Sequence, residues 1–128
     1  MEILGIIGQI IFGAFWIRSG IGHLKNISAM ALYTGSRNIP MPKLAVIVTG
    51  FLLIFGGLGI ILGAYVTYAI LALIIFIVPT TFFMHSFWKD TDLSAKMGNE
   101  VNFYKNLALF GSLLLLLQFA ESFPYSLI

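Results

Sequence analysis

Two histidines, His23 and His85, are the residues of this sequence best suited to chemistry. A neutral imidazole exchanges protons near neutral pH, forms hydrogen bonds with ligand oxygens and binds metals. Cysteine is absent, so thiolate chemistry and thiolate metal ligation are excluded for the chain acting alone. The two histidines lie far apart in the sequence. They can therefore share a site only if the intervening elements bring them together.

These elements are too apolar for a protein that folds in water. Charged residues form 9% of the chain and hydrophobic residues 59%, whereas about 25% of the residues in soluble domains are charged. From Leu44 to Trp88 no charged side chain occurs. A membrane-spanning helix needs roughly 20 apolar residues, so this stretch predicts two spans joined by a tight turn. The sequence thus indicates a single-domain integral membrane protein.

Four membrane spans are predicted in total, over about residues 3–23, 44–62, 66–87 and 100–121. Short connections make consecutive helices antiparallel neighbours. The expected fold class is therefore all-α, an integral membrane four-helix bundle. In the second span Gly56, Gly59 and Gly63 lie near one face, and we expect them to allow close packing within the molecule. Pro79 is expected to kink the third span, with Thr80 and Thr81 hydroxyls satisfying the freed carbonyls.

The basic residues indicate the orientation. All seven lie in or beside two connections, residues 24–43 and 88–100, whereas both termini and the Gly63 turn carry none. The positive-inside rule places these two connections in the cytoplasm and both termini outside the cell membrane. Within the first connection we expect a short surface helix, capped by Asn26 or Ser28 and ended near Gly35.

The same charge pattern bears on partners. The chain has no basic run with interleaved aromatic residues, so we expect no nucleic-acid partner. The expected partners are the lipid bilayer and other membrane protein subunits or a second copy of the chain. No metal is expected, because two histidines supply too few ligands for a closed site.

All four predicted spans bring polar side chains to the same, cytoplasmic end. Polar groups within a membrane face the bundle interior or a water-filled cavity, and a functional site is the default hypothesis for them. Arg18 and Lys105 have a second interpretation, because long cationic side chains at helix ends also reach for the interface. The candidate cofactor-binding residues are His23, His85, Trp88, Asn102, Lys105 and Asn106. At the opposite end, Gln9 and Gln118 are expected to pair across helices.

Four motifs, in the correct order, resemble the DoxX family of small four-helix membrane proteins. Ser19-Gly-Ile-Gly-His23-Leu is similar to the end of the family's first helix, and Gly50-Phe-Leu-Leu-Ile-Phe-Gly-Gly57 to its glycine-rich second helix. Phe83-Met-His85-Ser-Phe87-Trp88 resembles its His-x-Phe-Trp ending. Lys105-Asn-Leu-Ala-Leu-Phe-Gly111 resembles its Lys-Asn-Leu-Ala-Leu-x-Gly motif in the fourth helix.

The resemblance implies a function as well as a fold, since the family includes the DoxD-type subunits of archaeal thiosulfate:quinone oxidoreductase. It implies an accessory or quinone-associated subunit of a membrane redox complex, with a quinone as the candidate cofactor. Phe83, Phe87 and Trp88 would then pack on the quinone ring. Many members carry a glutamate where this chain has Leu53, so quinone chemistry by this chain alone is not implied.

A second reading of the same residues remains open. The alternative is a non-catalytic assembly or structural subunit of a membrane protein complex, and the catalytic residues, if it is an enzyme, are unknown. Transport of a small molecule is disfavoured, because the sequence lacks two similar halves and a polar site at the membrane midplane.

Overall fold

The computed structural model describes residues 2–128, and this part of the chain is helical without strands. It contains five α-helices, namely α1 (Glu2–Lys25), α2 (Ile27–Ser36), α3 (Pro42–Leu62), α4 (Val66–Pro79) and α5 (Leu93–Gln118). Three short segments complete it: the π-helical η1 (Thr80–Met84) and the 3-10 turns η2 (Phe87–Lys89) and η3 (Ala120–Ser122). The predicted all-α class is confirmed. The simple four-helix count is not, because α2 forms a fifth helix in the first connection.

Three of the helical segments in residues 2–128 are long and apolar enough to cross a membrane: Glu2–Lys25, Pro42–Leu62 and Val66–Lys89. They coincide closely with the first three spans expected from the sequence. Helix α5 is not among them, because its first half is polar and its apolar run begins only at Leu107. A fourth span over residues 100–121 therefore stays a prediction.

Helices α1 and α3 pack backbone against backbone. A Cβ atom on Gly57 would lie 2.6 Å from the carbonyl oxygen of Gly13, and one on Gly20 would lie 2.6 Å from that of Gly50. Such distances leave no room for a side chain at these positions. The glycines recur every seven residues on both helices, so they meet in two pairs along an antiparallel interface.

The α3–α4 hairpin uses a second set of glycines. A Cβ on Gly56 would lie 2.6 Å from Leu73 Cγ, and one on Gly59 would lie 2.5 Å from Ala69 Cβ. Gly63 ends α3 in the left-handed region, with φ of 60°, where glycine carries no steric penalty. These glycines therefore serve packing within the molecule, as the sequence predicted.

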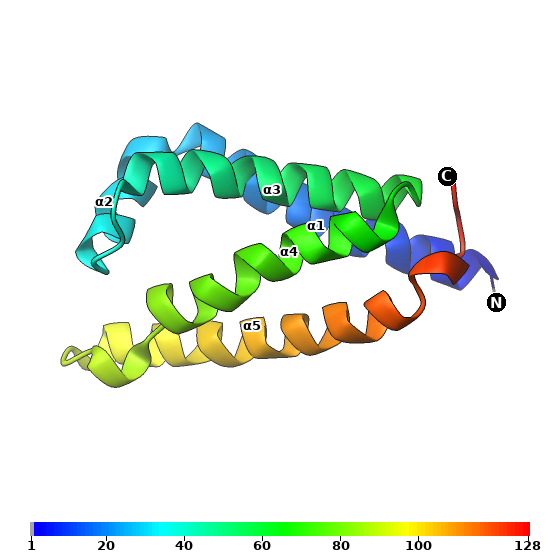
Figure 1. Ribbon diagram of the computed structural model, residues 1–128. Coiled ribbons are helices and arrows are strands. Elements are labelled where there is room, and N and C mark those ends of the chain that lie inside the picture. The colour runs from blue at the N-terminus through cyan, green and yellow to red at the C-terminus, as the bar shows by residue number, and fades with distance from the viewer. Residues whose placement is uncertain (1) are drawn as a thin grey trace.

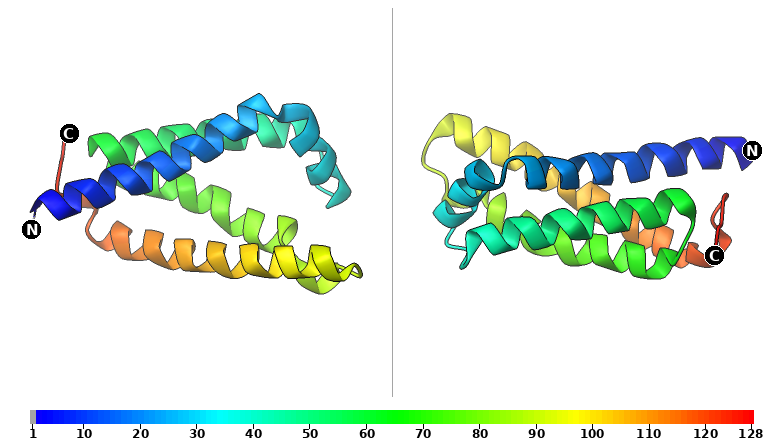
Figure 2. Two further views of the ribbon diagram at one scale, coloured as in Figure 1. Left: turned by 180° about the vertical axis from the view of Figure 1, so that it is seen from behind. Right: turned by 90° about the horizontal axis from the view of Figure 1, so that it is seen from above.

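Helix α4 lies obliquely between the α1–α3 pair and α5 (Figure 1). It approaches α3 next to the Gly63 turn and approaches α5 next to η1. Helix α5 buries only Asn99, Asn106 and Leu113, which are seven residues apart on one face, and it packs mainly against α4, η1 and η2. Both termini lie at the end opposite α2, as the further views in Figure 2 also show.

Proline interrupts the α4 helix close to the predicted site. Pro79 has no N–H to offer the preceding turn, and the chain continues beyond it as the π-helical segment η1 rather than as α-helix. The Thr81 hydroxyl donates a 2.6 Å hydrogen bond to the Ile77 carbonyl oxygen. That carbonyl is not the one of Ile75, four residues before Pro79, so the expected pairing of the freed carbonyl with Thr80 and Thr81 is not confirmed. The π-helical turn and the bend at Ser86 then direct the chain towards α5.

Candidate functional site

A cavity of about 520 Å³ lies at the α2 end of the bundle. Helices α1 and α3 line one side of it, α4, η1 and α5 line the other, and α2 contributes Met30, Tyr33 and Thr34. Apolar side chains, including the aromatic Phe15, Trp16 and Phe76, form most of its walls. Its volume falls within the range of roughly 300–1,000 Å³ that is usual for small-molecule sites.

The structure brings four of the six predicted site residues to this cavity. His23 reaches it from α1, His85 from the bend after η1, and Lys105 and Asn106 from α5. Residues that are far apart in the sequence therefore line one space. Thr49 and Thr80, two further polar residues of the same predicted membrane end, line it as well.

The other two predicted residues lie elsewhere. Asn102 lines a second, smaller cavity of about 380 Å³ together with Arg37 and Asp90. Trp88 lines neither cavity; its ring is half exposed and packs edge-on against Phe103. The structure thus does not place Trp88 where a ligand ring could rest on it. The aromatic residues that do line the larger cavity are ones that the sequence did not single out for this role.

The ring of His23 is held by α3. Its Nδ1 lies 3.0 Å from Thr49 Oγ1 and 3.4 Å from the Val46 carbonyl oxygen. The hydroxyl hydrogen of Thr49 is already directed at backbone, because Oγ1 lies 2.7 Å from the Ala45 carbonyl oxygen. Both neighbours of Nδ1 therefore act as acceptors, and Nδ1 carries the hydrogen that it donates to them.

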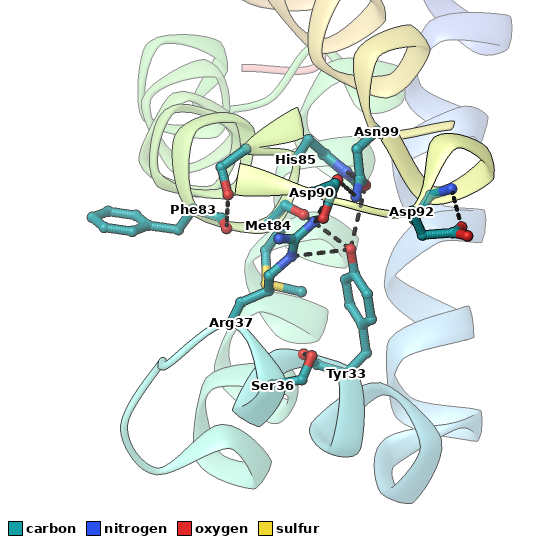
Figure 3. A network of polar contacts seen from close by, with 11 residues as sticks. Tyr33, Ser36, Arg37, Phe83, Met84, His85, Asp90, Asp92 and Asn99 are labelled. Atoms are coloured by element: carbon teal, nitrogen blue, oxygen red, sulfur yellow. Dashed lines mark hydrogen bonds and ion pairs between the residues drawn. The ribbon is translucent and has the colours of Figure 1, made fainter. Parts of the chain in front are cut away.

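The ring of His85 is held by a polar network between α2, the η2 segment and α5, shown in Figure 3. Its Nδ1 lies 3.2 Å from Asn99 Oδ1. Asn99 Nδ2 donates a 2.8 Å hydrogen bond to Asp90 Oδ2, and Arg37 forms a 3.1 Å ion pair with the same carboxylate. The Tyr33 hydroxyl donates to the Met84 carbonyl oxygen at 3.1 Å and accepts a hydrogen bond from Arg37 at 3.2 Å.

The charge of Asp90 fixes the direction of this network. The hydrogen bond from Asn99 and the nearby Arg37 guanidinium hold the pKa of Asp90 below its usual value, so at neutral pH the carboxylate can only accept. The NH₂ group of Asn99 must then face Asp90, and its Oδ1 must face His85. Nδ1 of His85 is consequently a donor, as it is in His23.

Several polar groups of the cavity are left without a protein partner. Nε2 of His23, Nε2 of His85 and the side-chain amide of Asn106 take part in none of the hydrogen bonds within residues 2–128. They are not among the fully buried polar atoms, so each keeps some accessible surface. These open positions therefore mark the cavity as a place where a polar ligand or water completes the bonding.

The charge of the cavity is one-sided. Lys105 supplies a cation, and none of the described residues lining the cavity is acidic. Within residues 2–128 no group of three or more His, Cys, Asp or Glu residues is placed to hold a metal ion. The lining therefore suits an organic ligand with oxygen atoms.

The DoxX family model matches residues 6–86, well over half of the chain. The chain belongs to the DoxX family. The matched region includes both histidines but ends before α5, so the resemblance of the Lys105–Gly111 motif stays a prediction. The search of curated proteins gave no match, and the search of solved structures gave none either.

Leu53 of this DoxX protein, which stands where many members carry a glutamate, is fully buried in the hydrophobic core. It is not part of the cavity lining. A carboxylate at this position would accordingly lie in the core and not against a ligand in the cavity. The polar groups of the cavity are thus complete without it.

The sequence missed the network around Asp90. Arg37, Asp90 and Asn99 lie in or beside the connecting segments, where charged and amide side chains usually face water. The one available signal was that Arg37 and Asp90 lie at the same predicted membrane end and carry opposite charge. That signal does not specify pairing, because it fits several other pairs equally well.

Proposed function

We propose that this DoxX protein is an accessory, quinone-associated subunit of a membrane redox complex, and that the 520 Å³ cavity holds the quinone headgroup. The observation that supports this proposal best is the composition of the cavity: aromatic and aliphatic walls with a few convergent, unpaired polar groups. A quinone headgroup has matching chemistry, since it is a flat apolar ring with oxygen atoms at its edge.

The proposed site draws on separate elements. His23 and His85 offer Nε2 as an acceptor for ring hydroxyls, Asn106 offers an amide that donates or accepts, and Lys105 offers a positive charge for ring oxygens. Phe15 and Phe76 supply apolar wall. A family that includes subunits of a quinone oxidoreductase, as the sequence resemblance indicated, adds support from an independent direction.

The proposal includes a topology. The chain crosses the cell membrane several times, with α5 as the last span, both termini outside and the α2 end in the cytoplasm. The positive-inside rule supports this orientation, because the basic residues gather at the α2 end. Reporter fusions after residue 36 and at the C-terminus test it: a cytoplasmic signal for the first and an external one for the second are expected, and the reverse pattern would refute the orientation.

The binding experiment uses purified protein in lipid nanodiscs, with decylubiquinone as the probe and quenching of tryptophan fluorescence as the readout. Trp16 lines the cavity, so a ligand there should quench it. Asn106→Leu is expected to weaken binding by about tenfold, because one hydrogen bond to the ligand is lost and a polar position becomes apolar.

Asn102→Leu is the matched control, since Asn102 lies one turn away on the same helix but faces the smaller cavity. It should bind the probe as the wild type does. Equal weakening by both substitutions would show that the effect comes from α5 as a whole, and a wild-type protein that binds no quinone in either redox state would remove the proposal.

The alternative is a non-catalytic assembly subunit. It is supported by the outer face of α5, where Val101, Tyr104 and Leu115 are more than half exposed and Gly111 has open space around it. Replacing both histidines by alanine separates the two functions. Lost turnover in an intact complex supports the quinone-associated role, whereas unchanged turnover and unchanged assembly support the alternative.

A further inference from the structure

We infer that the cavity selects the reduced, dihydroxy form of a ring ligand, a hydroquinone, over the corresponding quinone. This inference rests on the proposed function and specifies which redox form of the ligand binds more tightly. The two redox forms have nearly the same shape. They differ at the ring oxygens, which donate hydrogen bonds in the hydroquinone and can only accept them in the quinone.

The first argument comes from the two imidazoles. A neutral imidazole carries one hydrogen, so a ring that donates from Nδ1 presents Nε2 as an acceptor. In His23 the hydrogen lies on Nδ1, because Thr49 Oγ1 and the Val46 carbonyl oxygen accept from it at 3.0 and 3.4 Å. The ring of His23 lines the cavity, and its Nε2, which carries no hydrogen, is matched by a hydroxyl group and opposed by a carbonyl oxygen.

In His85, too, Nδ1 donates and Nε2 accepts, and the reason is independent of that for His23. The ion pair between Arg37 and Asp90 fixes the carboxylate as an acceptor, the carboxylate fixes the amide of Asn99, and Asn99 Oδ1 accepts from His85 Nδ1 at 3.2 Å. Two rings on different elements line one cavity, and Nε2 of each is an acceptor. Placing two quinone carbonyls against them would bring pairs of acceptors together without a hydrogen between them.

The remaining polar groups do not reverse this preference. Asn106 can donate or accept and so fits either redox form. Lys105 only donates, and both a quinone carbonyl and a hydroquinone hydroxyl oxygen accept from an ammonium group. No electron transfer is part of this inference, which concerns the relative affinity for the two forms.

The direct test compares affinities in nanodiscs. Decylubiquinol under anaerobic conditions is expected to bind at least about tenfold more tightly than decylubiquinone, because one or two hydrogen bonds form in the first complex and not in the second. Equal affinity, or tighter binding of the quinone, would overturn the selectivity while leaving the proposed function intact. Absence of binding by both forms would remove both proposals.

A second test addresses the imidazoles themselves. The chain has only two histidines, so nitrogen NMR of ¹⁵N-histidine-labelled protein resolves both rings. At a pH where the rings are neutral, Nδ1 of each should show the shift of a protonated nitrogen and Nε2 that of an unprotonated one. Protonated Nε2 in both rings would overturn the inference even before any ligand is added.

A matched pair of variants links the two measurements. Thr49→Val removes the nearest acceptor of His23 Nδ1 and is expected to lower the ratio of hydroquinone to quinone affinity by about threefold or more. Thr67→Val makes the same change at an exposed residue of α4 that does not line the cavity. It should leave the ratio unchanged. A ratio that is equal in both variants would contradict the role of Thr49 as the residue that positions the His23 hydrogen.

Discussion

Helix α3 and helix α5 are held in the molecule in opposite ways. Helix α3 meets α1 through paired glycines, with close backbone approach at Gly13–Gly57 and at Gly20–Gly50. Helix α5 buries one residue in seven, namely Asn99, Asn106 and Leu113, and two of these three are polar. The first interface depends on close steric fit, whereas the second depends on a hydrophobic anchor at one end and a polar network at the other.

The difference has a consequence for the cavity. One of its walls, formed by α1 and α3, is fixed by contacts that no side-chain rotation can relieve. The opposite wall on α5 carries Lys105 and Asn106, and α5 packs on the core through the side chain of Leu113 and its apolar neighbours. The cavity thus lies between an α1–α3 wall held by close glycine packing and an α5 wall held by side-chain contacts.

The largest effect is expected from breaking the fixed interface. Gly57→Ala would place a Cβ atom 2.6 Å from the Gly13 carbonyl oxygen, so α1 and α3 must separate. A destabilisation of about 1–3 kcal/mol is expected from such overpacking, measured by thermal or denaturant unfolding in detergent. On α5, Gly111→Ala is the matched control, because nothing lies within 4 Å of its added Cβ. That control should stabilise the helix by up to about 1 kcal/mol, and a similar loss in both variants would contradict the contrast between the helices.

The next largest effect is expected from the hydrogen bonds of Gln9, which connect α1 to α3 and to the C-terminal tail. Gln9 Nε2 donates to the carbonyl oxygens of Ile60 at 2.7 Å and Tyr125 at 2.9 Å, while Oε1 accepts from the Tyr125 N–H at 3.0 Å. Gln9→Leu leaves the partly buried backbone N–H and carbonyl of Tyr125 without this partner, at a cost of about 1 kcal/mol. We expect faster hydrogen exchange and proteolysis of the C-terminal tail. Gln118→Leu, at an exposed residue, should change neither.

For Gln9, the sequence predicts the need for a hydrogen-bond partner but not the identity of that partner. Its burial and its need for a partner could be inferred, because an amide within an apolar span must be hydrogen-bonded. The expected partner, Gln118, was wrong: the tail after Pro124 folds back over α1 and supplies Tyr125 instead. The direction of a short tail depends on tertiary contacts, and no periodicity in the sequence encodes them.

The candidate site was predictable to a similar degree. The gathering of polar residues at one membrane end was enough to select His23, His85, Lys105 and Asn106. Polar side chains within an apolar bundle face its interior or a cavity. Asn102 looked equivalent to Asn106, since one turn separates them. Only the rotation of α5, set by the burial of Asn99, Asn106 and Leu113, decides that the two amides face different cavities.

The polar network that holds α5 gives a smaller, pH-dependent effect. The pKa of Asp90 is held below its usual value by Asn99 and Arg37, so its ionised form stabilises the folded state. That contribution is present above the ordinary aspartate pKa of about 3.9 and is lost as the pH falls through the lower pKa of the folded protein.

Asp90→Asn is therefore expected to flatten the loss of stability below about pH 4, as measured by unfolding at a series of pH values. Glu121→Gln, which leaves the Arg37–Asp90 pair intact, should retain the steep acid limb of the wild type. An unchanged acid limb in Asp90→Asn would show that this network does not hold α5. Looser attachment of α5 should also weaken ligand binding at neutral pH in this variant.

The smallest effect is expected at Trp16. Its ring is 1% exposed, and its Nε1–H is the one buried side-chain polar atom without a hydrogen-bond partner in residues 2–128. Trp16→Phe removes apolar volume, which is destabilising, but it also removes an unpaired donor, which is stabilising. The two changes should offset each other to within about 1 kcal/mol in unfolding measurements. A loss above about 2 kcal/mol would show that removing the unpaired donor does not offset the lost apolar volume.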